Sequence, residues 1–387
     1  MKDKYIPFYR TPITAKQIKA VVGTLKSGWL TTGPAVHMFE EKVSEYLGAK
    51  YAIGVSSCTA GLHLALLAAG VGPGDEVITT PYTFIASIEA IVHCGAIPVF
   101  ADIDPETFNL SASEAEKKIT RKTKAIMPVH IAGLPCDIPA FERLSRKYKI
   151  RLVHDAAHAI GSAHRGRKIG AIPDITSFSF YATKNITTGE GGMVTTSSKE
   201  WAESIRILSL HGMDRHAWKR YRKSGNWYYE VTKLGYKYNL ADLNARLGLA
   251  QFDEFEKMQR MRIRAAHWYD DALADIEEVI LPPRDAESDH AWHLYIIRIS
   301  CQKLSIGRDQ VIERLTELGV GTSVHFIPVF MHPYYRKQYK LKSRDYPRSA
   351  DVYKSVITLP LFPGIRKSEV AEVARRLKIV LAGAKRR

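Results

Sequence analysis

Short apolar segments alternate with stretches of helical character through the first half of the chain. The segments expected to be strands are residues 51–55, 76–80, 97–101, 125–129 and 150–154. Strands separated by helices favour a mostly parallel sheet that is covered on both faces, with right-handed crossovers. Because ligands of such sheets gather beyond the carboxyl ends of the strands, Asp155 falls at a predicted binding edge.

The second half of the chain has a different pattern. After a polar, aromatic loop at 211–238, the expected elements are a long helix at 241–273, a strand at 292–299, a helix at 308–318, a strand at 322–326 and a helix at 367–380. A chain of 387 residues is too long for one small core. We therefore expect a large domain over residues 1–260, which begins with a helical segment, and a small α+β domain over 261–387.

The composition limits the classes of function. Lys and Arg number 56 against 40 Asp and Glu, which gives a net charge of +16. Such a surface attracts nucleic acid, anionic membranes or phosphorylated small molecules, but the positive residues are scattered except at 219–223 and 385–387. A scattered excess indicates solubility more than a dedicated groove, so we expect no nucleic-acid partner.

The location follows from three further features. The four cysteines lie far apart, without a Cys-x-x-Cys pair, so we expect neither a metal site nor a disulfide framework. The N-terminus has no apolar core of a signal peptide, and no stretch approaches the length of a membrane span. These features predict a cytoplasmic protein that is not inserted in a membrane.

Lys184 and Asp155 are the pair that most strongly suggests chemistry. Lys184 follows the apolar, aromatic segment 177–183, and desolvation makes a lysine amine nucleophilic. A lysine and a carboxylate can together hold pyridoxal phosphate (PLP). The amine forms a Schiff base with the aldehyde, and the carboxylate keeps the pyridine nitrogen protonated, so that the ring is an electron sink. Alone, such a lysine is more often a side chain that extends into solvent from a strand end.

Two segments are candidates for a phosphate site. Small residues at 56–61 lie between a predicted strand and helix, where backbone N–H groups and the helix dipole attract anions. Thr59 can cap this helix while its hydroxyl reaches a phosphate oxygen, although a plain cap without a ligand is the alternative. Ser179 is a second candidate donor from another strand end.

Three further residues are candidates for contact with the cofactor ring. Phe84 follows a strand and can stack on a planar ring, or pack in the core. Ala157 is small enough for close approach to the opposite ring face. His158 can hydrogen-bond a phenolic oxygen, with a structural role as the alternative. The glycine-rich run 188–192 permits close backbone contact beside Lys184, or forms a hairpin turn before a strand at 193–196.

The chain resembles the DegT/DnrJ/EryC1/StrS sugar aminotransferases, which are PLP enzymes of fold type I, like aspartate aminotransferase. The runs that carry the resemblance are 28–34, 155–159, 184–192, 235–239 and 290–293. Within the family the chain is most similar to the UDP-4-amino-4-deoxy-L-arabinose aminotransferase type, in the runs 184–187, 235–239 and 321–326.

The resemblance implies roles for individual residues. Lys184 would be the Schiff-base lysine and proton shuttle, Asp155 would bind the pyridine nitrogen, and Phe84 would stack on the ring. The residues implied at the phosphate and the phenolic oxygen are Thr59, Ala60, Ser179 and His158.

The resemblance also implies a homodimer in which the loop 235–239 of the partner subunit completes each site. Many relatives carry asparagine where Lys237 stands, so either Lys237 or Asn239 can be the phosphate contact. The arabinose type has histidine where this chain has Tyr181. Tyr181, Glu190 and His325 are the candidate substrate-binding residues.

The implied reaction moves an amino group from L-glutamate to a nucleotide-diphosphate-linked 4-keto sugar, with a UDP-sugar favoured, in amino-sugar or surface polysaccharide biosynthesis, including lipopolysaccharide. Amination of a 3-keto sugar stays open, and so does a PLP-dependent sugar dehydratase, although that branch carries histidine where Lys184 stands. A non-catalytic regulator or nucleic-acid-binding protein is a remote alternative that rests on charge alone.

Overall fold

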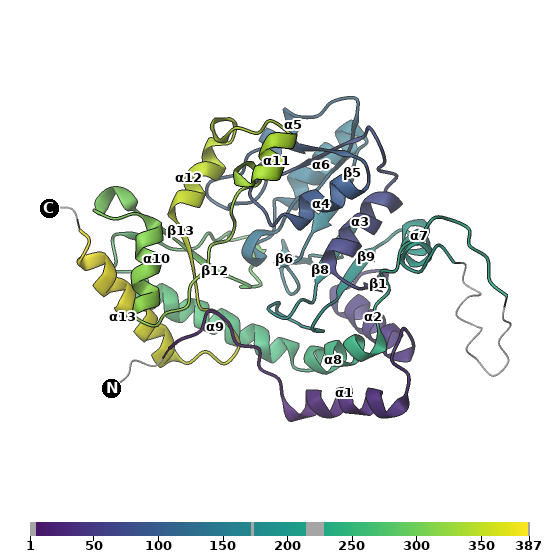
Figure 1. Cartoon of the computed structure of the whole chain (residues 1–387), viewed down its shortest axis with the longest axis horizontal. Coiled ribbons are helices and arrows are strands. Elements are labelled where there is room, and N and C mark those ends of the chain that lie inside the picture. The colour runs from purple at the N-terminus through teal and green to yellow at the C-terminus, as the bar shows by residue number, and fades with distance from the viewer. Residues whose placement is uncertain (1–4, 172–173, 214–227, 386–387) are drawn as a thin grey trace.

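The computed structural model describes residues 5–171, 174–213 and 228–385. Figure 1 shows a large mixed α/β part beside a smaller part that contains the C-terminal helix. The basic run 219–223 and residues 214–227 of the loop predicted at 211–238 lie outside the described residues.

The central sheet has seven strands in the order β1-β9-β8-β5-β4-β2-β3. Neighbours from β8 to β3 pair in parallel, whereas β9 is antiparallel to both β8 and β1. Within this sheet, β9 alone therefore runs against the others, and the predicted α/β fold with a mostly parallel sheet is confirmed. The bounds are β1 Tyr51–Val55, β2 Glu76–Thr79, β3 Ile97–Phe100, β4 Thr123–Ile126, β5 Arg151–Asp155, β8 Ile175–Ser179 and β9 Gly192–Thr196.

Helices cover both faces of this sheet (Figure 1). On one face lie α3 (Cys58–Ala68), α4 (Ala86–His93) and α7 (Lys199–Ser209). On the other lie α2 (Pro34–Leu47), α6 (Ile138–Tyr148) and α8 (Asp242–Phe252). Side chains alternate along a strand, so neighbouring residues of β9 feed the two cores: Val194 packs in the first and Met193 in the second.

A second, three-stranded sheet belongs to the C-terminal part, in the order β10-β12-β13. The strands are β10 Val279–Ile280, β12 Tyr295–Ile299 and β13 Val356–Leu359. They share a core with α9 (Phe255–Leu273), α10 (Arg308–Glu317) and α13 (Lys367–Ala382). Ile6 belongs to this core and bridges Val320, so the N-terminal segment also packs here. The predicted division at residue 260 falls inside α9 and stays a prediction.

The remaining helices and strands of the described chain are mostly short. They are α1 Ala15–Ser27, α5 Ala112–Glu116, α11 Pro333–Gln338, α12 Pro347–Ser355, β6 Ala163–His164, β7 Arg167–Lys168, β11 Ser288–Asp289, and the 3₁₀ helices η1 Ile131–Gly133, η3 Cys301–Lys303, η4 Val329–Met331 and η5 Ser343–Asp345.

Two expected elements differ from the structure. The long helix at 241–273 is interrupted, because Glu254 leaves helical geometry at φ −107° and ψ 2° between α8 and α9. The strand expected at 322–326 is absent from the described chain. Only Ser323 bridges the edge of β13, at Thr358, and the residues that follow leave the sheet. Phe326 packs instead with Tyr82 and Val129 of the large part of the chain, which draws the segment away from β13.

Asp242 joins α8 to the N-terminus of α2. Its carboxylate accepts hydrogen bonds from the backbone N–H groups of Gly33, Ala35 and Val36, at 2.8, 3.0 and 3.0 Å. Gly33 precedes α2 and has no side chain with which to cap the helix, so the aspartate satisfies amides that the helix itself leaves unpaired. This buried contact fixes the N-terminal helical segment against the rest of the fold.

Replacing Asp242 with alanine should destabilise the protein by about 3 kcal/mol, because the buried amides lose charge-assisted hydrogen bonds. Denaturant unfolding at neutral pH measures this loss. The matched control is Asp253→Ala, which removes half-exposed ion pairs with Lys16 and Lys42 and should cost less than about 1 kcal/mol. Equal losses for the two variants would contradict the capping role of Asp242.

Candidate active site

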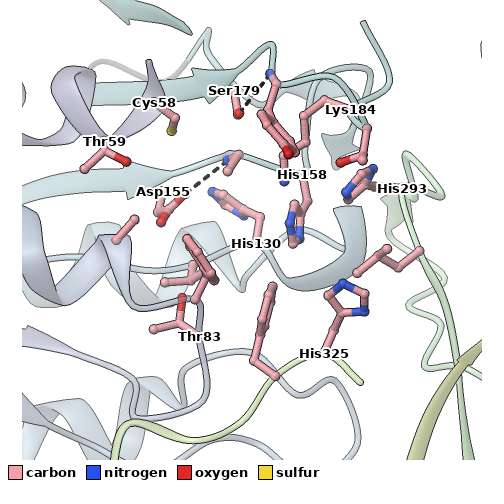
Figure 2. A pocket seen from close by; sticks show the side chains of 18 of the residues that line it. Cys58, Thr59, Thr83, His130, Asp155, His158, Ser179, Lys184, His293 and His325 are labelled. Carbon is pink, nitrogen blue, oxygen red and sulfur yellow. Dashed lines mark hydrogen bonds between the residues drawn. The ribbon is translucent and has the colours of Figure 1, made fainter. Parts of the chain in front are cut away.

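A cavity of about 580 Å³ opens at the carboxyl ends of the central strands. Its wall contains Cys58 and Thr59 beyond β1, Asp155 at the end of β5, and Ser179 at the end of β8 (Figure 2). Small-molecule sites commonly enclose about 300–1,000 Å³ and lie at this edge of an α/β sheet. The cavity is therefore the candidate active site.

Asp155 is a buried carboxylate held in a fixed orientation. Its Oδ2 accepts a hydrogen bond from the Ser87 hydroxyl at 2.7 Å, and its Oδ1 accepts one from the Ala157 backbone N–H at 3.1 Å. Burial raises the pKa of Asp155, and these two bonds with the charge of Lys184 oppose the rise only in part. A cationic nitrogen in the cavity would stabilise this carboxylate strongly.

Lys184 lines the same cavity from the loop that joins β8 to β9. Its backbone N–H donates to the carbonyl of Tyr181 at 2.9 Å, which fixes the base of the side chain. Desolvation lowers the pKa of Lys184 to about 8, although the nearby Asp155 carboxylate favours the ammonium form. An amine with such a pKa exchanges protons readily near neutral pH and is a competent nucleophile.

The start of α3 supplies an anion site. Ser57, and not Thr59 as expected, caps the helix: its hydroxyl accepts the N–H of Ala60 at 3.1 Å. Thr59 lines the cavity instead, beside the helix N-terminus. A Cβ at Gly192 would lie 2.7 Å from the carbonyl carbon of Ser57, so only glycine lets β9 pass this close to the helix start.

Aromatic rings form the wall between the two parts of the chain. The His158 ring stacks near Phe326, with centroids 5.7 Å apart and planes 17° apart, and lies 4.4 Å from the His293 ring. Phe84 faces Phe326 at 6.1 Å and remains 61% exposed. A large aromatic side chain this exposed at a cavity mouth is available to stack on a planar ligand.

His325 brings the C-terminal part into the cavity. Its Nδ1 lies 2.9 Å from the Thr358 hydroxyl, and its ring stacks on Phe8 of the N-terminal segment at 5.8 Å. Burial, with the charge of Lys184, lowers the pKa of His325 to about 3, so the ring is neutral. Tyr9 follows Phe8 along the wall and hydrogen-bonds the backbone carbonyl of Ala182, two residues before Lys184.

The structure brings most of the predicted site residues together. Those that line the cavity are Thr59, Phe84, Asp155, Ala157, His158, Ser179, Tyr181, Lys184, Glu190 and His325. Ala60 does not line it, and its backbone N–H donates to the Ser57 hydroxyl. Lys237 and Asn239 do not line it either: Lys237 is exposed, and Asn239 donates to the Thr32 hydroxyl at 2.7 Å.

Several lining residues were not predicted from the sequence. They are Phe8, Tyr9, Ser57, Cys58, Thr83, Ala86, Val129, His130, Thr183, Gly191, His293, Leu294, Phe326, Leu359 and Leu361. His293 lies in the 290–293 run that the resemblance includes, which was a usable signal. Phe8 and Tyr9 carried no such signal in the sequence, because they reach the cavity only through the packing of the N-terminal segment against the C-terminal part.

The groups that line the cavity match those of PLP and do not form a metal site. An amine, a buried carboxylate, a helix N-terminus and an exposed aromatic ring match the aldehyde, the pyridine nitrogen, the phosphate and the ring face of the cofactor. Within residues 5–171, 174–213 and 228–385, no cluster of three or more His, Cys, Asp or Glu side chains is arranged to hold a metal ion.

Known proteins resemble the chain over nearly its full length. It is 47% identical to an uncharacterised protein of Methanocaldococcus jannaschii over 382 residues, and 45% identical to the spore coat polysaccharide biosynthesis protein SpsC of Bacillus subtilis over 384 residues. Both alignments cover 99% of this chain and 99% of the relative.

Solved structures share the fold. The putative sugar aminotransferase Spr1654 from Streptococcus pneumoniae, in its PMP form, superposes with a TM-score of 0.92 at 34% identity, covering 98% of this chain and 99% of the other. DesI, solved in the presence of its TDP-sugar product, gives a TM-score of 0.88 at 30% identity, covering 99% of this chain and 94% of the other. Spr1654 is also known in a PLP form, so the fold is that of PLP-dependent transferases of fold type I.

The family comparison extends from just before α1 into α13. The DegT/DnrJ/EryC1/StrS aminotransferase family matches residues 12–378, a range that contains Lys184, Asp155 and most of the wall around them. The chain belongs to this family of PLP-dependent sugar aminotransferases.

Proposed function

We propose that the protein transfers the amino group of L-glutamate to a nucleotide-linked 4-keto sugar, with a UDP-sugar favoured. The observation that carries the proposal is that Lys184 and Asp155 line one cavity, at the edge where the strands of the sheet end. The TDP-sugar product of DesI supports a nucleotide sugar as the substrate class. The net charge of +16 favours a substrate that bears a diphosphate.

The proposed roles follow from the position of each side chain. When bound, PLP supplies an electron sink for the carbon that loses or gains the amine. Asp155 keeps the ring nitrogen protonated, Thr59 and Ser179 bind the phosphate, and Ala157 with Phe84 encloses the ring. Lys184 gives and takes the proton at its Nζ atom, for which a pKa of about 8 suits neutral pH.

The substrate side of the cavity has a polar and an aromatic component. Tyr181, Glu190 and His325 line it, and the first two are exposed. We propose that these residues contact the sugar. Glu190 and Tyr181 offer hydrogen-bond partners for hydroxyl groups, and the neutral His325 ring offers another without adding charge.

A panel of nucleotide keto-sugars incubated with the enzyme, PLP and glutamate tests the proposal. We expect formation of 2-oxoglutarate and of one amino sugar, identified by mass spectrometry and NMR. The NMR spectrum also separates amination at C4 from amination at C3, and a deoxygenated product would identify a dehydratase. Failure of every keto sugar, with any amino donor, would refute the proposed reaction.

Lys184→Ala is the matched control for this reaction. Amine transfer should fall by at least about 100-fold, because the proton at the reacting carbon loses its carrier. The visible absorbance of the lysine–cofactor linkage should also disappear, while far-UV circular dichroism stays unchanged. A fully active Lys184→Ala enzyme would refute the assignment of Lys184 as the proton carrier.

Asp155→Asn should separate stability from activity. Burial raises the pKa of Asp155, so the stability linked to this group is fully present below the unfolded value of 3.8 and is lost as pH rises through the folded pKa. At neutral pH the cofactor-free variant should therefore unfold at an equal or higher temperature than cofactor-free wild type. Amine transfer should fall on the order of 100-fold, the cost of losing one preorganised electrostatic group.

Thermal unfolding at pH 7 and at pH 3.5 checks the stability arm of this prediction. The difference between the variant and wild type should shrink at the lower pH, where the Asp155 carboxyl is mostly protonated in both states. A cofactor-free variant that is clearly less stable at pH 7 would show that Asp155 has a structural role instead.

We further propose a homodimer in which the loop 235–239 of the partner subunit completes the site. Two observations support it: the cavity mouth leaves Phe84 and Tyr181 exposed, and the chain's own Lys237 and Asn239 lie elsewhere. Asn239 is engaged with Thr32, whereas Lys237 is exposed, so we favour Lys237 as the phosphate contact.

Mixing two inactive variants tests this arrangement. Lys184→Ala chains mixed with Lys237→Ala chains should regain about a quarter of the wild-type activity, because half of the dimers are mixed and each has one intact site. The same mixture with Asn239→Ala is the comparison. No recovery in either mixture, with exchange confirmed by mass spectrometry, would contradict a shared site.

The cellular setting is also a proposal. The similarity to a spore coat polysaccharide biosynthesis protein supports a role in surface polysaccharide synthesis. Among the described residues, no helix combines the length and apolar character that crossing a bilayer requires. We propose a cytoplasmic location, which fractionation of the source cells would check.

A further inference from the structure

Asn185 directly follows Lys184 and is 4% exposed. Its side-chain amide Nδ2 donates to the backbone carbonyl of Ala291 at 2.8 Å and to Oε1 of Gln259 at 3.2 Å. Its Oδ1 lies 3.1 Å from Nδ1 of His293. The residue beside the lysine is thus bonded on every side to other parts of the chain.

The orientation of this amide is not arbitrary. A backbone carbonyl can only accept a hydrogen bond, so the side of Asn185 that faces Ala291 must be the NH₂ group. Gln259 agrees, because its own Nε2 donates to the same carbonyl at 3.0 Å and leaves Oε1 for Asn185. Oδ1 of Asn185 therefore faces His293 as an acceptor.

An acceptor at this position fixes the protonation of His293. Nδ1 must carry a proton to donate to Asn185. Burial lowers the pKa of His293 well below its usual value, and the nearby cations Lys184 and Arg262 lower it further. The ring is therefore neutral, with its proton on Nδ1 and a bare lone pair on Nε2.

The backbone of His293 is held as firmly as its ring. Arg262, which is 1% exposed, donates from Nη1 to the carbonyls of Trp292, His293 and Leu361, at 3.3, 3.3 and 3.2 Å. Figure 2 shows the His293 ring next to Lys184, and both residues line the cavity. The unprotonated Nε2 is thus a preorganised hydrogen-bond acceptor in a site where the proposed reaction frees the Lys184 amine.

We infer that His293 is a positioning residue for Lys184: Asn185 holds its proton on Nδ1, and Nε2 accepts a hydrogen bond from the Lys184 amine whenever that amine is free. This inference rests on the proposed role of Lys184 as the proton carrier. A lysine has a flexible four-carbon stem, so a fixed acceptor is needed to keep Nζ oriented between the two half-reactions. A protonated imidazole could not serve, because it would repel the ammonium group.

The tautomer of His293 is a direct test that does not depend on turnover. Holoenzyme labelled with ¹⁵N-histidine should give one ring, absent from the His293→Gln spectrum, with its proton on Nδ1 between about pH 6 and 8, since an unperturbed histidine titrates there. A proton on Nε2 of that ring, or titration within this range, would overturn the inference.

Two substitutions separate the two ring nitrogens. Glutamine at position 293 places an acceptor near Nε2, whereas asparagine keeps only a donor near Nδ1. His293→Gln should retain amine transfer within about tenfold, and His293→Asn should lose about 100-fold, the scale expected when a reacting group is misplaced. The reverse order would show that the ring serves only to pack against Asn185.

Asn185→Asp provides the pH readout. A carboxylate beside Nδ1 would favour the imidazolium form, so transfer by this variant should be low near pH 6 and recover as pH rises. His267→Gln is the control: its side chain is 62% exposed, and both activity and pH profile should match wild type. An unchanged profile for a folded, cofactor-loaded Asn185→Asp enzyme would contradict the inference.

These results are distinguishable from failure of the proposed function. If wild type aminates no keto sugar, the reaction assigned above fails, while the NMR experiment still reports the proton on His293. If wild type is active but His293 carries its proton on Nε2, only the positioning role of His293 is refuted.

Discussion

The parallel pairing of β5 with β8 decides where chemistry can take place in this fold. The register aligns Asp155 with Ser177, so the buried carboxylate and the end of β8 reach the same edge of the sheet. The loop after Ser179 is then closed by hydrogen bonds from Phe180 to Gly191 and from Thr188 to Phe180, each at 2.9 Å. Lys184 projects from this loop, so its amine and the Asp155 carboxylate meet in one cavity.

The sequence was sufficient to predict the residues that lie at strand ends. Asp155, Ser179 and Thr59 each follow an apolar segment, and the strand–helix alternation alone places such residues at one edge. The capping residue was missed, because Ser57 and Thr59 are equally good caps by composition and only the observed start of α3 at Cys58 separates them.

Residues brought in from distant segments could not be predicted in this way. Ser87 lies within α4, and its bond to Asp155 depends on how that helix crosses the sheet. Phe8 reaches the cavity because Ile6 pairs with Val320 of the C-terminal part. The break between α8 and α9 could not be predicted either. The helical spacing of apolar residues continues across it, whereas the backbone leaves helical geometry at Glu254.

The charged groups buried in the cavity reduce the stability of the folded chain. Burial raises the pKa of Asp155 and lowers that of Lys184 to about 8, so each charge is less stable here than in water. The pKa values of His158, His293 and His325 are all lowered by burial, which leaves the histidine side of the wall without charge. A ligand of complementary charge would offset the cost of burying these charged groups.

The open side of the cavity bears on substrate choice. Phe84 and Tyr181 are 61% and 48% exposed, although aromatic side chains of this size are normally covered. In the proposed dimer the partner subunit would cover them, and the sugar would then lie between surfaces of two chains. In this proposal the groups assigned to the chemistry lie at the strand ends and in the β8–β9 loop of one chain, whereas the groups that surround the sugar come from the surfaces of two chains.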